Sequence, residues 1–303
     1  MTLKEWQTKG IQYLYKNHKI FTIDEGEGED LLLIHGFPTS SWDWWQMHQE
    51  LTKKYRVLCL DMIGFGFSAK PRKYNYSIFD QADLIEDFLQ SKHIKTVKIL
   101  SHDYGDTVAQ ELLARFNQRE LENKPGLNIE SLCFLNGGLF VDSYKPLFIQ
   151  KLLMSPLGGL VGRFFTREKL GKNFKMIFGP HTQPSELELD EFWELINFNG
   201  GKYVVHLVIR YMKERVINQN RWLAATQHTN VPLRLIDGLA DPISGQNMVK
   251  MYKKIIPNPD VVDLEEIGHF PLIEAPEQVL EHYLAFIENL NNESAPKSHE
   301  TTK

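Results

Sequence analysis

The feature that most constrains the fold of this chain is a short polar segment, Ser101-His-Asp-Tyr-Gly-Asp106, between two regular patterns. An apolar run at 96–100 precedes the segment and predicts a buried strand, while the helical spacing of apolar residues at 107–116 predicts a helix. Ser101 and Gly105 flank Asp103, as expected for a turn that is too tight for large side chains. The pattern therefore predicts a strand, a sharp turn and a helix, with Asp103 at the apex of the turn.

Asp103 at such an apex is a candidate nucleophile. An ionised carboxylate needs no general base to activate it, so it suits attack on a carbon that bears a leaving oxygen or halide. Asp is also a good helix-capping residue, and the alternative is that Asp103 only caps the helix that follows. The choice between these roles depends on whether the rest of a catalytic triad is present.

The remainder of the chain alternates strand-like and helix-like patterns. This alternation predicts an α/β fold with a mostly parallel, eight-stranded sheet and helices on both faces. Strands are expected at 12–15, 19–23, 31–34, 56–60, 96–100, 131–135, 232–236 and 261–264, and helices at 42–51, 77–92, 107–116, 246–256 and 276–290.

The alternation stops between residues 139 and 229, where helical and aromatic segments occur without a convincing parallel strand. We therefore expect residues 139–229 to form a helical lid inserted into one core, whose two parts are residues 1–138 and 230–290. The polar residues 291–303 are expected to form a disordered tail.

Two further reactive side chains follow late strands. Asp241 lies in the segment after the strand predicted at 232–236, and His269 lies in the segment after the strand at 261–264. With Asp103 they give the chain order nucleophile, acid, histidine, which is one known order of a catalytic triad. Asp237 is an alternative acid, although it stands nearer to the strand end than to the apex of the loop.

A second turn, His35-Gly-Phe-Pro38, follows the strand expected at 31–34. The backbone N–H groups of Phe37 and Tyr104 are the candidate donors of an oxyanion hole, and Gly36 would let the chain approach the nucleophile closely. An ordinary strand-to-helix turn is the alternative. The Gly-punctuated segment at 61–68 lacks the glycine spacing and the Lys-Ser/Thr pair of a phosphate-binding loop.

Composition narrows the class of partner and the compartment. The formal net charge of −5, without a dense basic stripe, argues against a nucleic acid partner. Cys59 and Cys133 lie in separate apolar runs and are expected to be buried packing residues rather than a disulfide or a metal site. No signal peptide and no apolar stretch of about 18 residues is visible, so we expect a cytoplasmic protein without a membrane span.

Several segments together resemble the α/β-hydrolase family, and specifically its Asp-nucleophile branch of epoxide hydrolases and haloalkane dehalogenases. The resemblance extends over about residues 10–290 and is carried by His35-Gly-Phe-Pro-Thr-Ser-Ser-Trp-Asp-Trp44, Asp61-Met-Ile-Gly-Phe-Gly-Phe-Ser68, Ser101-His-Asp-Tyr-Gly105, Asp241-Pro242 and Gly268-His-Phe-Pro271.

The resemblance implies a two-step hydrolysis of a small apolar electrophile, with no cofactor. Asp103 would form an alkyl-enzyme ester, and His269, oriented by Asp241, would then activate the water that hydrolyses the ester. His35 and Trp44 in the first matching segment, and Tyr211 and Trp222 in the lid, are the candidate substrate-binding residues.

The leaving group separates the alternatives. An epoxide oxygen needs a hydrogen-bond donor, which the family supplies from lid tyrosines; Tyr211 fits the second of these, while Tyr144 and Tyr203 are weaker candidates for the first. Dehalogenases place a Trp after the nucleophile and often an Asn two residues after the oxyanion histidine, where this chain has Tyr104 and Phe37. We therefore expect an epoxide hydrolase-like enzyme. The alternatives are a dehalogenase, with Trp193 or Trp222 as halide donor, and a non-catalytic binding protein.

Overall fold

A computed structural model describes residues 1–143 and 146–294 of the chain. At its centre is one eight-stranded sheet in the order β1-β2-β4-β3-β5-β6-β7-β8. β1 and β2 form an antiparallel hairpin, β2 pairs with β4 in the antiparallel sense, and all other neighbours are parallel. The mostly parallel α/β fold predicted from the sequence is confirmed.

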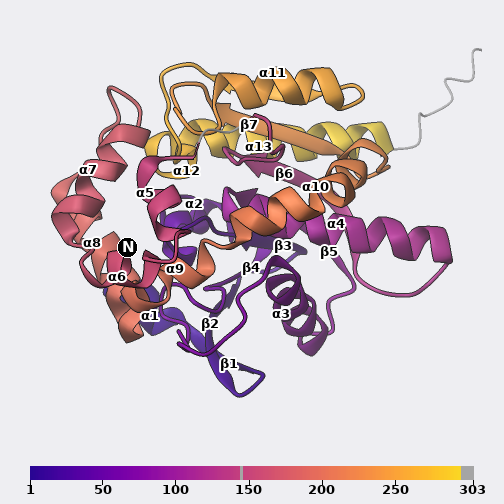
Figure 1. Ribbon diagram of the computed structural model, residues 1–303. Coiled ribbons are helices and arrows are strands. Elements are labelled where there is room, and N and C mark those ends of the chain that lie inside the picture. Colours follow the sequence, from indigo (N-terminus) through magenta and orange to yellow (C-terminus); the bar gives the residue numbers. More distant parts are fainter. Residues whose placement is uncertain (144–145, 295–303) are drawn as a thin grey trace, which may run out of the picture.

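Each predicted strand is present, within a few residues of its expected limits. The strands are β1 (Ile11–Tyr15), β2 (His18–Glu25), β3 (Glu29–Ile34), β4 (Tyr55–Leu60), β5 (Thr96–His102), β6 (Asn128–Leu135), β7 (Leu233–Gly238) and β8 (Asp260–Leu264). Figure 1 shows β1 and the helix α11 at opposite ends of the molecule.

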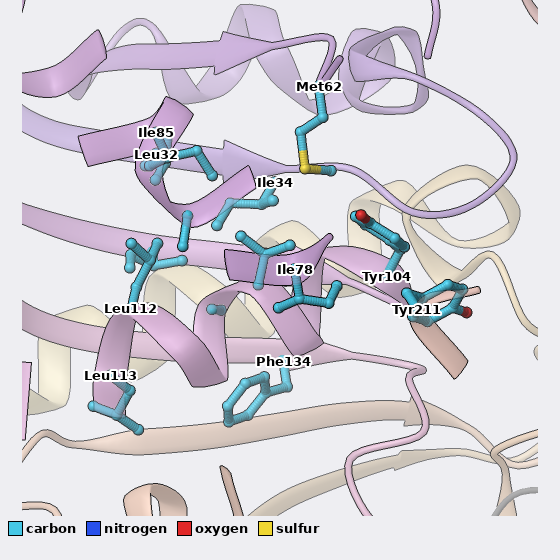
Figure 2. Close-up of a cluster of buried hydrophobic side chains, with 14 of the residues drawn as sticks. Leu32, Ile34, Met62, Ile78, Ile85, Tyr104, Leu112, Leu113, Phe134 and Tyr211 are labelled. Carbon is cyan, nitrogen blue, oxygen red and sulfur yellow. The ribbon is translucent and has the colours of Figure 1, made fainter. Parts of the chain in front are cut away.

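Helices cover both faces of the sheet and bury two apolar clusters. One cluster contains residues of α3 (Ile78–Ser91), α4 (Tyr104–Glu122) and α11 (Gln246–Ile255), and part of it is drawn in Figure 2. The other contains residues of α1 (Leu3–Lys9), the 3₁₀ helix η1 (Ser41–Trp44), α2 (Trp45–Leu51), α12 (Pro271–Glu274) and α13 (Pro276–Ser294). Cys59 and Cys133 are fully buried in the second cluster, as expected.

The chain between β6 and β7, which we call the insertion, is helical in its described residues. Its helices are α5 (Phe148–Leu153), α6 (Gly158–Arg163), α7 (Arg167–Ile177), α8 (Glu186–Asn197), the 3₁₀ segment η2 (Phe198–Tyr203), α9 (Val205–Val208) and α10 (Tyr211–Gln227). Figure 1 shows α7 and α8 to one side of the sheet, at the left, and α10 packs against α4.

The two ends of the chain differ from expectation. Residues 1–10, for which no helix was predicted, contain α1, whose first turn is closed by a reciprocal capping box between Thr2 and Glu5 and whose Trp6 is fully buried. α13 continues to Ser294, into the segment expected to be a disordered tail, and residues 295–303 lie outside the described residues. None of the described helices is long and apolar enough to cross a membrane.

Candidate active site

Asp103 occupies a sharp turn between the end of β5 and the start of α4. Its backbone has φ 48° and ψ −104°, a conformation that a residue with a side chain adopts only under strain. Asp103 holds the N-cap position of α4, but its side chain makes no capping hydrogen bond to that helix. The carboxylate instead lines an internal cavity with 7% of the residue exposed, which is the position expected of a nucleophile.

The small residues around Asp103 are required by close backbone packing. A Cβ on Gly105 would lie 2.4 Å from the carbonyl oxygen of Ile34 and 2.8 Å from that of His35. Ser101 donates a hydrogen bond of 2.6 Å to Asp106, and burial raises the pKa of the Asp106 carboxyl well above its usual range. The buried Asp106 side chain therefore holds the turn through Ser101, and Gly105 lets α4 approach β3 closely.

The other two members of the predicted triad are beside Asp103. His269 Nδ1 lies 2.7 Å from Asp241 Oδ2, and His269 Nε2 lies 3.9 Å from Asp103 Oδ1. Asp241 also accepts hydrogen bonds from the backbone N–H groups of Ile243 and Ser244 and from the Ser244 hydroxyl, which fix its carboxylate toward the imidazole.

The rival acid, Asp237, does not contact His269. It is fully buried at the end of β7, where burial raises the pKa of its carboxyl well above the usual range. Asn136 donates to Asp237 at 3.4 Å and to Asp241 at 3.3 Å, and its oxygen accepts from the N–H of Gly238. Asn136 thus links the end of β6 to Asp237 and Asp241, although Asp237 itself does not reach His269.

The charges at the site favour a protonated imidazole. Burial opposes the charged form of His269, but the negative charge of Asp241, its hydrogen bond and the nearby carboxylates of Asp103 and Glu274 raise the pKa of His269 to about 9. Burial likewise opposes ionisation of Asp241, yet His269 and the Ser244 hydroxyl hold the pKa of Asp241 below its usual value. The resting site therefore favours an imidazolium at position 269 at neutral pH.

One predicted oxyanion donor already contacts the nucleophile. The N–H of Phe37 donates to Asp103 Oδ2 at 3.1 Å. Tyr104 is the first residue of α4, where a backbone N–H has no acceptor within its own helix. The turn that presents Phe37 is held by His35, whose Nδ1 donates to the Gly36 carbonyl and whose Nε2 accepts from the N–H of Met62.

His35 is therefore a positioning residue rather than the substrate contact that we expected. Its ring is fully buried, and burial lowers its pKa, so the imidazole is neutral and both nitrogens are engaged within the protein. Trp44 is also fully buried, in the cluster that contains α2 and α13, and it does not line the cavity.

The predicted lid contacts are placed differently as well. Trp222 donates its indole N–H to Glu111 at 2.9 Å and lies away from the cavity of Asp103. Tyr211 is packed edge-on against Tyr104, with ring centroids 4.6 Å apart, and Figure 2 shows the two rings together. Tyr203 carries the guanidinium of Arg72 over its ring, and Tyr144 lies outside the described residues.

The cavity itself is small and mostly apolar. Its volume of about 70 Å³ is enough for on the order of five water-sized spheres. Besides Asp103 and His269, the described residues that line it include two polar side chains, Gln150 of α5 and Asn173 of α7. The apolar part of the wall comes mainly from the insertion, with further residues from the turn at 35–38 and from the segment after β7. These apolar residues are Phe37, Pro38, Leu147, Ile149, Leu153, Phe165, Leu170, Phe174, Ile177, Ile196, Val205 and Ile243.

Three residues that position His269 were not identified from the sequence. His102 Nε2 donates to the carbonyl of His269 at 2.8 Å, and burial followed by the nearby His269 lowers the pKa of His102 to about 3. The N–H of His269 donates to the carbonyl of Ile177, at the end of α7. Glu274 accepts from the N–H groups of Gly268 and Phe270, on either side of His269.

Curated relatives of this chain cover nearly its whole length. The mesoderm-specific transcript homolog protein of Bos taurus is 40% identical over 94% of this chain and 88% of its own. The protein LipZ of Mycobacterium tuberculosis, which is named as a hydrolase, is 33% identical over 94% of this chain and 98% of its own. A more distant relative, the cis-3-alkyl-4-alkyloxetan-2-one decarboxylase of Shewanella oneidensis, is 24% identical over 91% of this chain and 87% of its own.

Solved structures with the same fold include both enzyme types that the sequence suggested. A haloalkane dehalogenase from Bradyrhizobium elkanii has a TM-score of 0.77 at 17% identity, over 94% of this chain and 98% of its own. The epoxide hydrolase CorEH has a TM-score of 0.74 at 19% identity, over 93% of this chain and 99% of its own. Residues 31–120 match the family model of the α/β-hydrolase fold. With relatives of this similarity and coverage, the chain belongs to the α/β-hydrolase superfamily.

Proposed function

We propose that this protein is a hydrolase that uses Asp103 as its nucleophile and opens a small apolar epoxide through an alkyl-enzyme ester. The observation that carries the proposal is the strained turn that holds a carboxylate in the cavity, 3.1 Å from the N–H of Phe37 and 3.9 Å from His269. The insertion supplies most of the cavity wall, which supports its role as a lid.

In the first step an oxygen of Asp103 attacks an sp³ carbon of the epoxide. A new carbon–oxygen bond forms, and the ring carbon–oxygen bond breaks to leave an alkoxide. Ring strain drives this step, and the alkoxide takes its proton from the imidazolium of His269, which leaves the imidazole neutral for the second step. The two carboxamides, Gln150 and Asn173, are the described neutral side chains able to donate hydrogen bonds to the leaving oxygen.

In the second step water hydrolyses the ester. His269 removes a proton from water, and the resulting hydroxide attacks the carbonyl carbon of the Asp103 ester. The N–H groups of Phe37 and Tyr104 stabilise the oxyanion, a contribution of about 3 kcal/mol for each donor. Collapse of the intermediate releases a diol and regenerates the carboxylate.

Dehalogenation is the weaker alternative because neither tryptophan that the sequence offered as a halide donor supplies its indole N–H to the cavity, where the carboxamides of Gln150 and Asn173 are the neutral side-chain N–H donors among the described residues. The indole N–H of Trp222 is already bonded to Glu111, and Trp193 packs against Phe165 without lining the cavity.

A strained lactone is the second candidate substrate. When a carboxylate attacks the ring carbon that bears the ring oxygen of an oxetan-2-one, the leaving group is another carboxylate. That group is far more stable than an alkoxide and needs hydrogen bonds rather than a proton, which suits a cavity with carboxamide donors. The Shewanella oneidensis relative is named for such a ring.

The substrate class can be tested by offering the purified protein styrene oxide, a 3,4-dialkyl oxetan-2-one and 1-bromobutane. We expect diol from styrene oxide and no bromide release above the rate of Asp103→Asn, which lacks the nucleophile. Consumption of the lactone alone would replace the epoxide with the second candidate. If wild type and Asp103→Asn behave alike with every compound, the protein is a binding module and not this enzyme.

The pKa of His269 should be lower in the ester form of the enzyme than in the resting enzyme. Esterification removes the charge of Asp103, one of the groups that raise the pKa of His269 to about 9, so the base of the ester form should titrate below 9. Hydrolysis of a pre-formed ester should therefore increase with pH and level off below pH 9. Single-turnover rates across pH measure this midpoint.

The same charge can be removed without substrate. In Asp103→Asn, an NMR titration should give a pKa of His269 lower than in wild type; equal values would contradict the coupling.

The pKa of His269 is higher in the folded protein than in the unfolded chain, so protonation of His269 stabilises the folded protein. This contribution to the free energy of unfolding should be complete below about pH 6.5 and be lost as pH rises through 9.

A further inference from the structure

Four large apolar side chains on neighbouring helices of the insertion point into solvent. Phe148 of α5 is 80% exposed, and on α6 and its two caps Leu157, Leu160 and Phe164 are 61%, 54% and 62% exposed. We call these four residues the apolar patch. Single exposed apolar residues are ordinary on protein surfaces, whereas several on two helices in contact with each other make a candidate interaction site.

The exposure of the apolar patch follows from the orientation of α6 on the protein. Gly158 and Gly162 face the protein, and a Cβ at these positions would lie 1.9 Å from the carbonyl oxygen of Leu153 and 2.5 Å from that of Lys202. Leu157, Leu160 and Phe164 are spaced by three and four residues and so share the opposite face. The helix therefore buries its glycines and presents its large apolar side chains outward, the reverse of an ordinary surface helix.

Along the chain, the charged residues within and beside the apolar patch are all basic. No acidic residue occurs between Asp142 and Glu168, although the whole chain carries a net charge of −5. Lys151 and Arg163 are exposed on the same two helices, and among the ion pairs of the described residues neither takes part in one. The patch is thus apolar with basic flanks on an acidic protein.

The apolar patch also lies directly outside the cavity wall. Ile149 and Leu153 of α5 line the cavity of Asp103, while Phe148 and Lys151 of the same short helix are exposed. The helix α5 therefore has one side on the cavity and the other at the surface.

We propose that the apolar patch seats the protein on the surface of a lipid bilayer that contains anionic lipids. The four side chains would enter the acyl boundary, while Lys151 and Arg163 would contact the headgroups. A second copy of the chain fits less well, because a two-fold contact between two such patches would bring the four cations together. If the proposed function also holds, small apolar substrates dissolved in the bilayer would enter the cavity beside α5.

Vesicle sedimentation tests this proposal. Wild type should bind vesicles of phosphatidylcholine and phosphatidylglycerol in equal parts better than vesicles of phosphatidylcholine alone. The triple variant Leu157→Ser, Leu160→Ser, Phe164→Ser should lower the partition coefficient by more than about tenfold, because three apolar groups no longer enter the bilayer. The variant Lys151→Glu, Arg163→Glu should abolish the preference for the anionic vesicles.

A matched control separates the patch from general surface hydrophobicity. Leu121 and Ile217 are 85% and 77% exposed outside the patch, and Leu121→Ser, Ile217→Ser should bind vesicles as wild type does. Failure of wild type to bind either vesicle, or an equal loss in the control variant, would overturn the proposal. So would a dimer, seen by light scattering, that the triple variant dissolves.

The vesicle experiment and the activity experiment test different proposals, and each can fail without the other. The triple variant should keep the wild-type circular dichroism spectrum and the wild-type turnover of styrene oxide in buffer, since none of its three residues lines the cavity. Vesicle binding without turnover of any electrophile would count against the proposed function alone. Turnover without vesicle binding would count against the apolar patch alone.

Discussion

Replacement of His269 by Gln should stop the reaction after its first step and leave the substrate covalently attached to Asp103. The attacking carboxylate, its contact with the N–H of Phe37 and the cavity wall are unchanged by the substitution, so ester formation should continue. Ester hydrolysis loses its general base and should slow by about 10²–10⁴-fold. Intact-mass measurement should show the protein increased by the mass of one substrate molecule, and peptide mapping should place the increase on Asp103.

Two further variants make this result specific. In Asp103→Asn, His269→Gln the mass increase should be absent, because the amide is a poor nucleophile; an increase in this variant would mean that another residue is alkylated. Asp241→Asn should also accumulate ester but less fully, since the imidazole remains and loses only the carboxylate 2.7 Å from Nδ1. If His269→Gln turns over as fast as wild type, the two-step mechanism is wrong.

The sharp turn at Asp103 could be predicted from the sequence because the need for small residues beside it is local. The turn between β5 and α4 needs a small residue where the carbonyl oxygens of Ile34 and His35 approach within 3 Å of the Gly105 position, and that requirement shows directly in the residue type. The order of Asp103, Asp241 and His269, which follow the parallel strands β5, β7 and β8, adds the rest, because the carboxyl ends of parallel strands meet at one edge of the sheet. Pattern and topology together therefore bring the three candidate residues to one site.

The lid contacts could not be predicted in the same way. The helical spacing of α10 shows that Tyr211 and Trp222 face inward, but an inward face can meet either a cavity or a neighbouring helix. The partner of Trp222 is Glu111, on a helix distant in sequence, and the partner of Tyr211 is the ring of Tyr104. Such pairs depend on how α10 docks on α4, which periodicity does not encode.

The residues that hold His269 were missed for a related reason. The side chains of His102 and Glu274 bond to backbone groups of residues 268–270, and Ile177 contributes only its carbonyl. Backbone groups are present at every position of a sequence, so they give no signal in it. α1 could have been recognised, because the spacing of Thr2 and Glu5 is that of a capping box.

The contact that docks α10 on α4 centres on one buried carboxylate, Glu111. Its side chain is 1% exposed and accepts hydrogen bonds from Arg115 of its own helix and from Arg221 and Trp222 of α10. Arg115 and Arg221 keep 18% and 36% of their side-chain surface exposed, whereas the Trp222 indole is buried. The carboxylate thus offsets its own burial by neutralising two cations and satisfying one buried N–H.

Glu111→Ala should consequently be among the most destabilising single substitutions outside the apolar clusters, lowering the free energy of unfolding by about 2–4 kcal/mol. The loss stays below that of a fully buried ion pair because both arginines can regain water, while the Trp222 N–H cannot. Glu111→Gln, which keeps an acceptor for the indole, should lose less, and Glu120→Ala on the exposed side of α4 should change stability by under about 0.5 kcal/mol. Urea unfolding measures all three, and a Glu111→Ala midpoint equal to that of Glu120→Ala would mean that apolar packing alone docks α10.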